Sequence, residues 1–397
     1  VEAGDAKPTL VVCPASLVYN WTAELERFAP SLDVCAIVGA KAQRRVQIAG
    51  VAEHNVVVTS YDLMRRDIDE YIEQDFARVV LDEAQYIKNP LTQVARAAKR
   101  LPAGVRFALT GTPIENRLSE LWSIFDFLMP GLLGTRDSFA KRFESPVEHA
   151  EGDSAARLQA LVSPFVLRRV KEDVVADLPE KIEDTVMAQL AGEQRKLYLA
   201  NQDRIAQQVQ HREAGEFKKD KLKVLAELTK LRQICCDPHL HYADYKAGSA
   251  KLDTCMELVH GALDGGHRIL LFSQFTGMLD IIGKRLAKED IAFLKLTGAS
   301  SKESRAKMVA QFQAGEVPVF LISLKAGGVG LNLTAADVVI HYDPWWNVAA
   351  QDQATDRAHR IGQQHAVTVY KLIAKDTIEE RIMQTQESKR DLVNSVL

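Results

Sequence analysis

Two adjacent acidic residues follow an apolar segment early in the chain, and their types and position suit nucleotide chemistry. Asp82 and Glu83 come directly after Val79-Val80-Leu81, a short run typical of a buried strand. Ligands of open parallel sheets bind at the carboxyl ends of the strands. Asp82 is therefore a candidate to hold nucleotide-bound Mg²⁺, which prefers one or two carboxylates plus phosphates, and Glu83 is a candidate general base for the attacking water. An exposed acidic pair without a catalytic role is the alternative.

A second predicted strand ends in small residues shortly afterwards. Thr110, Gly111 and Thr112 follow the apolar run that ends at Leu109. Small hydroxyl residues and glycine at a strand end allow close approach to a phosphate or to Glu83. The spacing after the acidic strand favours this interpretation over an ordinary turn.

The C-terminal half contains a glycine-rich segment and a pair of arginines. The run Ser323–Thr334 follows an apolar strand and includes Gly330, and its backbone N–H groups are suited to phosphates. Arg357 and Arg360 are three residues apart, which predicts one helix face for both guanidinium groups. Facing a γ-phosphate, they would stabilise transition-state charge as arginine fingers. A solvated helix face is the alternative for this pair taken alone.

The elements that must position these residues alternate between short apolar runs and helical patterns, as in parallel α/β proteins. Strands are predicted over Thr9–Cys13, Val34–Val38, Val56–Thr59, Ala77–Leu81 and Arg106–Thr110, and later over Arg268–Phe272, Phe293–Leu296, Val319–Ser323, Val338–Tyr342 and Val367–Leu372. Residues from about 115 to 250 are predicted to be mainly helical, with helices over Glu120–Leu128, Asp153–Leu161, Glu193–Arg212 and Lys218–Cys235. We therefore expect an α/β fold with two parallel-sheet lobes separated by a helical insertion.

Together the motifs resemble those of superfamily-two helicases, and more narrowly the Swi/Snf-type family of DNA-dependent ATPases. Val79–Gln85 and Leu109–Pro113 resemble motifs II and III, and the segments containing Gly330 and Arg360 resemble motifs V and VI. Further matches are Leu10–Trp21 with motif Ia, Thr59–Asp62 with Ib, Leu271–Thr276 with IV, Leu296–Gly298 and Arg305 with the next DNA-contacting element, and Leu167–Asp177 and Leu231–Cys235 with the interlobe segments. The resemblance covers nearly the whole chain and, through Asp343–Asn347, looks bacterial. It implies two RecA-like lobes.

The resemblance also implies a role for each matching residue. In a cleft that binds ATP and Mg²⁺ it places Asp82, Glu83, Gln85, Thr110, Gly111, Thr112, Gly330, Gln353, Asp356, Arg357 and Arg360. Against one strand of double-stranded DNA it places Ser16, Thr59, Tyr61, Ser273, Gln274, Thr297, Gly298, Ser323, Lys325 and Thr334. Phosphate contacts position a protein on DNA without reading its sequence. The implied activity is ATP-driven translocation on duplex DNA, with DNA-bound protein complexes as possible targets.

A phosphate loop of the type G-x-x-x-x-G-K-S/T is not found in the sequence. The family carries this loop just before motif Ia, which lies near the start of this chain. We therefore expect the first strand, the loop and its helix to precede Val1, and the isolated chain to bind ATP poorly and hydrolyse it slowly or not at all.

Composition limits the classes of protein and partner. The chain has 397 residues, which predicts two or three domains, and its net charge of -3 means that any contact with DNA must come from local patches. Its five cysteines are an odd, scattered set that fits a reducing compartment, so a cytoplasmic protein is expected. No apolar run is long enough to predict a membrane span. The expected domains are residues 1–165 (lobe 1), 166–250 (linker and helical insertion), 251–376 (lobe 2) and 377–397 (C-terminal helix packed on the lobes).

Three other features admit more than one interpretation. The run Cys235–His241 offers soft metal ligands, but a helix end followed by a proline turn is the preferred interpretation, since adjacent cysteines seldom close a tetrahedral site. Trp345 and Trp346 either brace the C-terminal helix or stack on nucleic acid. Four lysines either contact duplex DNA or form a solvated helix face: Lys218, Lys219, Lys221 and Lys223.

Two alternative functions stay open. One is a nucleotide-free DNA-binding or regulatory scaffold, which the missing phosphate loop favours and the acidic and arginine motifs disfavour. The other is an RNA helicase of the same superfamily, which the helical insertion and the form of motif VI disfavour.

Overall fold

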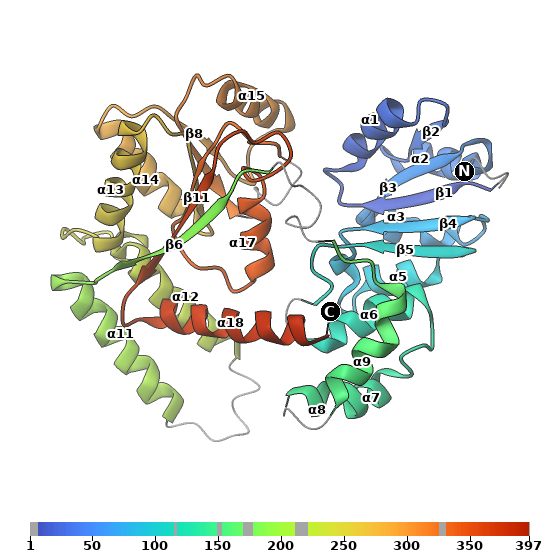
Figure 1. Ribbon diagram of the computed structural model, residues 1–397, viewed down its shortest axis with the longest axis horizontal. Coiled ribbons are helices and arrows are strands. Elements are labelled where there is room, and N and C mark those ends of the chain that lie inside the picture. The colour runs from blue at the N-terminus through green and yellow to red at the C-terminus, as the bar shows by residue number, and fades with distance from the viewer. Residues whose placement is uncertain are drawn as a thin grey trace. The chain divides into compact units, whose positions relative to one another are not determined.

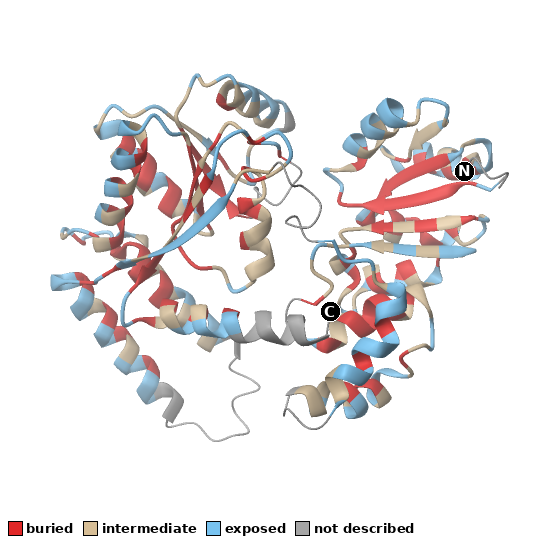
Figure 2. Cartoon of the chain, viewed as in Figure 1, coloured by how far each residue is buried: buried red, intermediate tan, exposed pale blue. Residues whose placement is uncertain are grey.

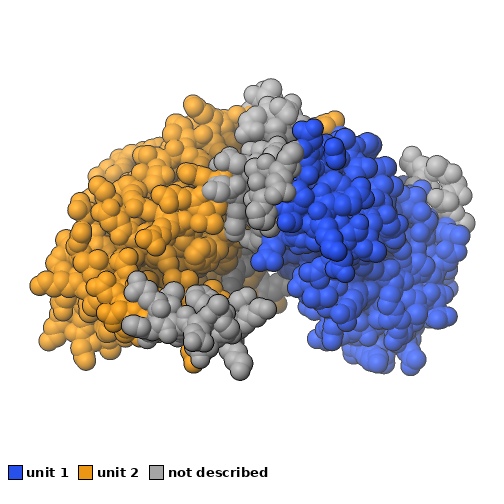
Figure 3. Space-filling model, turned by 90° about the horizontal axis from the view of Figure 1, so that it is seen from below, with its two compact units in different colours: residues 1–167, 389–397 blue, residues 168–388 orange. Residues whose placement is uncertain are grey.

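The computed structural model describes residues 7–114, 117–148, 153–169, 178–210, 221–324 and 331–396. The chain divides into two compact units, unit 1 with residues 1–167 and 389–397 and unit 2 with residues 168–388, which Figure 3 colours separately. Each unit contains its own parallel sheet. The expected fold class, α/β with two parallel-sheet lobes, is confirmed.

Unit 1 is built on five parallel strands in the order β2-β3-β1-β4-β5 (Figure 1). These strands are β1 (Thr9–Cys13), β2 (Val34–Ala36), β3 (Val56–Ser60), β4 (Arg78–Asp82) and β5 (Val105–Leu109). All five predicted strands are present, with ends shifted by one or two residues at most. β1 and β3 are buried along their whole length (Figure 2), as expected for strands covered on both faces.

Helices cover the two faces of this sheet with separate apolar cores. On one face α1 (Val18–Phe28) packs over Val11, Val56 and Val58. On the other face one core joins the sheet to α2 (Lys41–Ala49), α3 (Tyr61–Arg66), α4 (Ile68–Tyr71), α5 (Gln93–Arg100) and α6 (Leu118–Leu128). A further small core links α6 to α7 (Arg136–Phe139), α8 (Ser145–Glu148) and α9 (Ser154–Val162). The predicted helices near residues 120 and 154 are confirmed.

Unit 2 contains six parallel strands in the order β6-β11-β10-β7-β9-β8. They are β6 (Lys181–Ala188), β7 (Ile269–Ser273), β8 (Phe293–Leu296), β9 (Val319–Ser323), β10 (Val338–His341) and β11 (Val367–Ala374). The five strands predicted for this half are all present.

The sixth strand corrects the expected helical insertion. The prediction of mainly helical structure between the lobes is wrong over β6, which pairs with β11 along its full length. β6 is an exposed edge strand and has no continuous apolar run, so hydrophobic patterning could not reveal it. Backbone pairing holds it in place, together with an ion pair of 2.5 Å between Glu183 Oε2 and Lys371 Nζ.

The α-helices described in unit 2 are α11 (Gly192–Gln210), α12 (Lys221–Cys236), α13 (Ala250–Asp264), α14 (Thr276–Lys288), α15 (Lys302–Gln313), α17 (Val348–Thr355) and the first part of α18 (Ile378–Val396), which runs into unit 1 at residue 389. α11 and α12 share a small core that includes Tyr198, Leu231 and Ile234. The predicted helix end and proline turn are confirmed, since α12 stops at Cys236 and a 3₁₀ turn begins at Pro238. Within the described residues, no three His, Cys, Asp or Glu side chains cluster as a metal site requires.

All five cysteines are free thiols. Burial raises the pKa of Cys13 and that of Cys255 to about 12, so both stay protonated at neutral pH. None of the helices in the described part of the chain is both long enough and apolar enough to cross a membrane.

His341 is a buried polar residue in the core of unit 2. Its ring stacks on Phe272, and its Nε2 lies 2.8 Å from Thr355 Oγ1. Because the Thr355 hydroxyl donates to the Gln351 carbonyl, the His341 Nε2–H is the donor to Thr355. Burial, assisted by the charge of Lys371, lowers the pKa of His341 from 6.5 to about 3. The imidazole is therefore neutral in the folded protein.

We predict that His341 makes unit 2 sensitive to mild acid. Below pH 6.5 the unfolded chain takes up a proton that the folded chain excludes, so stability falls as the pH drops from 6.5 toward 3, by at most about 1.4 kcal/mol per pH unit. Urea unfolding from pH 6.5 down to about 5 should show a flatter pH dependence for His341→Phe than for the wild type. The exposed-site control His365→Gln should keep the wild-type slope. Parallel slopes for His341→Phe and wild type would contradict the prediction.

Candidate functional site

The polar residues singled out in unit 1 gather at the carboxyl ends of four neighbouring strands. Tyr61 follows β3, Ser16 follows β1, Asp82 ends β4 and Thr110 follows β5. Their strands are adjacent in the order β3-β1-β4-β5. The parallel direction of the strands thus brings residues up to about 90 positions apart to one edge of the sheet.

The acidic pair forms a strained turn at this edge. Glu83 has φ 54° and ψ 53°, a left-handed conformation that residues other than glycine rarely adopt. The Asp82 carboxylate holds the turn, since Oδ1 accepts from the Glu83 backbone N–H at 2.9 Å and Oδ2 accepts from the Trp21 indole N–H at 2.8 Å. Such backbone strain costs about 1–3 kcal/mol and is concentrated at functional sites. The role of Trp21 was not predicted, because it depends on how α1 packs beside β4.

A chain of hydrogen bonds connects the two motifs of unit 1. The Gln85 side chain donates from Nε2 to Glu83 Oε2 at 2.5 Å, and its Oε1 accepts from the Thr110 hydroxyl at 2.8 Å. Thr110 Oγ1 in turn accepts from the Thr112 backbone N–H at 3.1 Å. Gly111 is exposed, and a Cβ there would meet no atom within 4 Å. Gln85 thus fixes the Glu83 carboxylate relative to β5.

Tyr61 supports the acidic turn from the neighbouring strand. Its side chain is 2% exposed, and its hydroxyl donates to the Asp82 backbone carbonyl at 2.8 Å. Its ring stacks on Tyr86 with centroids 4.8 Å apart. Burial, and after it the charge of Asp82, raises the pKa of Tyr61. Thr59 is also buried and donates to the Ile37 carbonyl, so the phosphate contacts implied for Thr59 and Tyr61 stay predictions.

The residues at this edge fit a magnesium nucleotide. Each Asp82 oxygen accepts a single hydrogen bond from the described residues, and the side chain is only half-buried, so acceptor capacity remains for a cation. One carboxylate alone does not hold Mg²⁺, and the described residues form no cluster of three metal ligands. The cation would therefore arrive with the phosphates that complete its coordination.

Unit 2 has a comparable edge at the carboxyl ends of β10, β7, β9 and β8. Ser273 ends β7 and Ser323 ends β9, directly opposite each other in register and both buried. Thr297 and the exposed Gly298 follow β8. Asp343, just after β10, accepts from the Ser273 hydroxyl at 2.6 Å and from the Gln274 backbone N–H at 3.3 Å. Asp343 was not predicted as a site residue, although a carboxylate after a buried strand is the signal that identified Asp82.

The prediction that Arg357 and Arg360 share a helix face is wrong. α17 ends at Thr355, and both arginines lie in the turns that follow. Past Thr355 the backbone changes to tighter i→i−3 bonds, since the Arg357 and Ala358 N–H groups donate to the Ala354 and Thr355 carbonyls, and the Arg357 carbonyl accepts from the Leu333 backbone N–H. Both arginines belong to unit 2 and Glu83 belongs to unit 1, so their meeting at one nucleotide stays a prediction.

The remaining predicted residues are scattered. Gln353 and Asp356, at the end of α17, are half-buried. Thr334 precedes β10, at the amino end of the sheet, and lines a hollow of about 390 Å³ together with residues such as Gln313 and Asp337. Lys325 and Gly330 lie outside the described residues, as do Lys218 and Lys219.

The two tryptophans differ in their surroundings. Trp345 is partly buried against the core, and its carbonyl accepts from the Gln386 side chain of α18. Of the two expected roles, Trp345 therefore has that of bracing the C-terminal helix. Trp346 is 41% exposed and lies beside the guanidinium of Arg232, 5.5 Å from the ring centroid.

Comparison with known protein families gives two matches along the chain. A model described as the SNF2-related domain matches residues 2–240, and the helicase conserved C-terminal domain matches residues 250–362. The first match begins at residue 2, so it gives no support to the expectation that a strand and a phosphate loop precede Val1.

Several individual proteins are similar over almost the whole chain. An uncharacterized ATP-dependent helicase of Mycoplasma pneumoniae is 39% identical over 98% of this chain and 37% of its own length. The human TATA-binding protein-associated factor 172 is 35% identical over 98% of this chain and 24% of its own length. The structure of the Sulfolobus solfataricus SWI2/SNF2 ATPase core in complex with dsDNA is 37% identical, covers 98% of this chain and 82% of that chain, and superposes with a TM-score of 0.48. The chain thus spans well under half the length of both curated relatives.

We predict that the Tyr61 hydroxyl stabilises the acidic turn. Tyr61→Phe should lower the free energy of unfolding by about 1–3 kcal/mol, because the Asp82 carbonyl loses its donor. The stacked neighbour provides a matched control: Tyr86 is 52% exposed, so Tyr86→Phe should change stability by less than about 0.5 kcal/mol. Urea unfolding measures both variants. Equal effects of the two substitutions would contradict this assignment.

Proposed function

Since the chain belongs to the family of SNF2-related proteins with a helicase conserved C-terminal domain, we propose that it is an ATP-dependent motor that translocates along double-stranded DNA. The observation that carries the proposal is the hydrogen-bonded chain from the Asp82-Glu83 turn through Gln85 to Thr110. This arrangement holds one carboxylate at a strand end and positions a second through an amide, as ATP hydrolysis requires. The name of the Mycoplasma relative, an ATP-dependent helicase, agrees with this chemistry.

In this proposal the two acids have separate tasks. Asp82 holds nucleotide-bound Mg²⁺, which would neutralise charge on the phosphates. Glu83 accepts a proton from the attacking water, and Gln85 keeps its carboxylate in place. Arg357 and Arg360 of unit 2 stabilise charge on the transferred phosphoryl group.

The DNA grip is proposed to use both sheet edges. Ser16 and the residues after β7 and β8 contact phosphates of one strand, mostly through backbone N–H groups and small hydroxyls. A focused set of contacts of this kind suits a chain whose net charge is only -3. We also propose the domain division expected from the sequence, with lobe 1 up to residue 165 and lobe 2 over 251–376. The DNA-bound complexes on which such a motor acts are a further part of the proposal.

We predict that Glu83→Gln abolishes ATP turnover without weakening DNA binding. In the full-length protein, duplex DNA should stimulate ATP hydrolysis more than duplex RNA does, and the variant should lose at least about 100-fold in turnover. The exposed-site control Glu53→Gln should leave turnover unchanged. Stimulation by RNA alone would indicate an RNA helicase, and DNA binding without any ATP turnover in the wild type would indicate a scaffold.

We predict that the chain in isolation hydrolyses ATP slowly, because its sequence has no phosphate loop whose lysine and backbone N–H groups could hold the β- and γ-phosphates. Phosphate release by the purified chain, measured with saturating duplex DNA, should stay close to the rate of Glu83→Gln. Repeated turnover well above that rate would contradict the prediction. The match to the SNF2-related domain neither requires nor supports this deficiency.

A further inference from the structure

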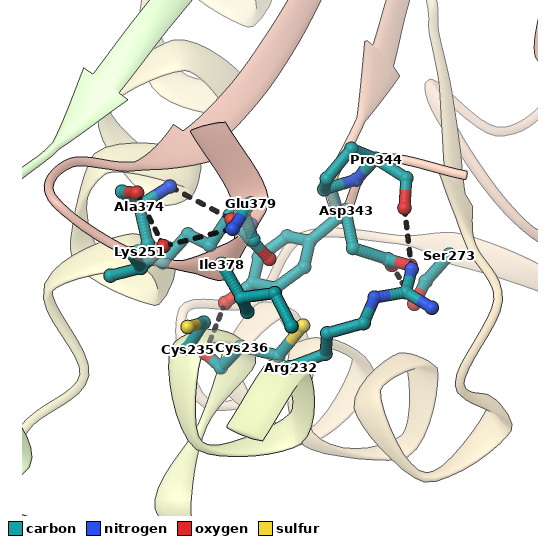
Figure 4. Close-up of polar contacts among 12 residues, drawn as sticks. Arg232, Cys235, Cys236, Lys251, Ser273, Asp343, Pro344, Ala374, Ile378 and Glu379 are labelled. Atoms are coloured by element: carbon teal, nitrogen blue, oxygen red, sulfur yellow. Dashed lines mark hydrogen bonds and ion pairs between the residues drawn. The ribbon is translucent and has the colours of Figure 1, made fainter. Parts of the chain in front are cut away.

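A carboxylate at the end of one strand holds the turn at the end of the next strand in unit 2. Asp343 Oδ1 accepts from the Ser273 hydroxyl at 2.6 Å and lies 3.3 Å from the Gln274 backbone nitrogen, while Oδ2 lies 3.4 Å from that nitrogen. Ser273 Oγ in turn accepts from the Phe275 backbone N–H at 3.1 Å. The Asp343 side chain therefore fixes the turn of residues 273–275, although Asp343 belongs neither to β7, which precedes the turn, nor to α14, which follows it (Figure 4).

Asp343 is fully buried and faces a buried cation. Its side chain is 0% exposed and lies 3.9 Å from the guanidinium of Arg232, whose side chain is 4% exposed. Arg232 comes from α12, donates to the Pro344 carbonyl, and lies beside the rings of Phe275 and Trp346. Burial raises the pKa of Asp343, while Arg232 and the Ser273 hydroxyl act in the opposite direction. The guanidinium thus helps to keep the carboxylate charged, which makes it a stronger acceptor for the turn.

The turn that Asp343 holds has donor capacity left for a ligand. Gln274 Nε2 is buried and has no hydrogen-bond partner among the described residues. α14 begins at Thr276 without a side-chain cap, so its first backbone N–H groups are not satisfied by a capping side chain. The turn lies at the carboxyl edge of the parallel sheet, where ligands of such sheets bind. Ser273 itself has committed its hydroxyl to Asp343 and is not a free donor.

We infer that Asp343 is a positioning residue for DNA, which holds the turn of residues 273–275 so that this turn and the first N–H groups of α14 meet a phosphate of the duplex. Arg232 supports it from the helical segment between the lobes. This inference rests on the proposed function, since it presupposes that the chain binds double-stranded DNA.

A second buried ion pair in the same unit provides a matched control. Lys251 Nζ and Glu379 Oε2 are 2.5 Å apart, and both side chains are 0% exposed. Glu379 Oε2 also accepts from the Ala374 backbone N–H at 2.8 Å, at the end of β11 rather than at the turn after β7 (Figure 4). Truncating either acid leaves a buried cation without its partner, but only Asp343 contacts the turn.

The experiment compares Asp343→Ala, Asp343→Asn and Glu379→Ala with the wild type. Binding to a fluorescent DNA duplex is measured by anisotropy over a series of salt concentrations, and melting temperature is measured in parallel. Asp343→Ala should bind the duplex about five- to tenfold more weakly. The slope of log binding constant against log salt concentration should become shallower by about the amount that one phosphate contact contributes. Asp343→Asn keeps Oδ1 as acceptor for Ser273 and Gln274 and should retain near wild-type binding despite a lower melting temperature. Glu379→Ala should lose melting temperature but keep both affinity and slope.

Each other outcome overturns the inference in an identifiable way. Unchanged binding by Asp343→Ala, or equal weakening by Asp343→Ala and Glu379→Ala, leaves Asp343 with a purely structural role. If Asp343→Ala does not fold at the assay temperature, Ser273→Ala replaces it in the experiment, because Ser273→Ala removes the hydroxyl that joins Asp343 to the Phe275 N–H. Unchanged DNA binding by Ser273→Ala also rejects the inference. A wild-type chain that binds no duplex DNA rejects the proposed function itself.

Discussion

The parallel direction of the strands is the constraint on which the rest of this structure depends. Every strand pair in the described part of both sheets is parallel, so the carboxyl ends of neighbouring strands lie along one edge. Asp82 and Thr110 become neighbours only because β4 and β5 run side by side, and Ser273 meets Asp343 because β7 and β10 do. An antiparallel arrangement of the same strands would send these residues to opposite edges.

The same constraint explains why each of the polar interactions described between motifs involves at least one side chain. Neighbouring strands lie roughly 5 Å apart and are joined by backbone hydrogen bonds, but this ladder stops where the strands end, so side chains connect the turns that follow. Gln85 spans this distance in unit 1, and Asp343 spans it in unit 2. In each unit one polar side chain therefore sets the geometry of the neighbouring turn, and the strain at Glu83 is maintained by such contacts rather than by the turn itself.

Unit 2 adds buried charge to this scheme. Removing ions from water is costly unless each charge is paired and its remaining hydrogen-bonding groups are satisfied. Lys251 with Glu379 and Arg232 with Asp343 meet the first part of that condition, since each pair joins a helix, α13 or α12, to a segment after β11 or β10 (Figure 4). The second part is not fully met among the described residues, because Glu379 Oε1 and Arg232 Nε are buried without a hydrogen-bond partner. Such pairs contribute little net stability, but separating either pair would leave a buried charge without its partner, so each pair ties its helix to the sheet.

The sequence alone determined the strands with continuous apolar runs and the residues that follow them, because hydrophobic patterning and strand-end chemistry are local properties. Asp82, Glu83 and Thr110 could be identified for that reason. Tertiary structure decided what patterning cannot encode: β6 is held by backbone pairing with β11 despite its exposed, charged side chains, and Arg357, in the turns after α17, accepts a backbone hydrogen bond from Leu333. It also decided the partners of Trp21 and Asp343, since contacts between residues 61 or 70 positions apart exist only once the sheet has formed.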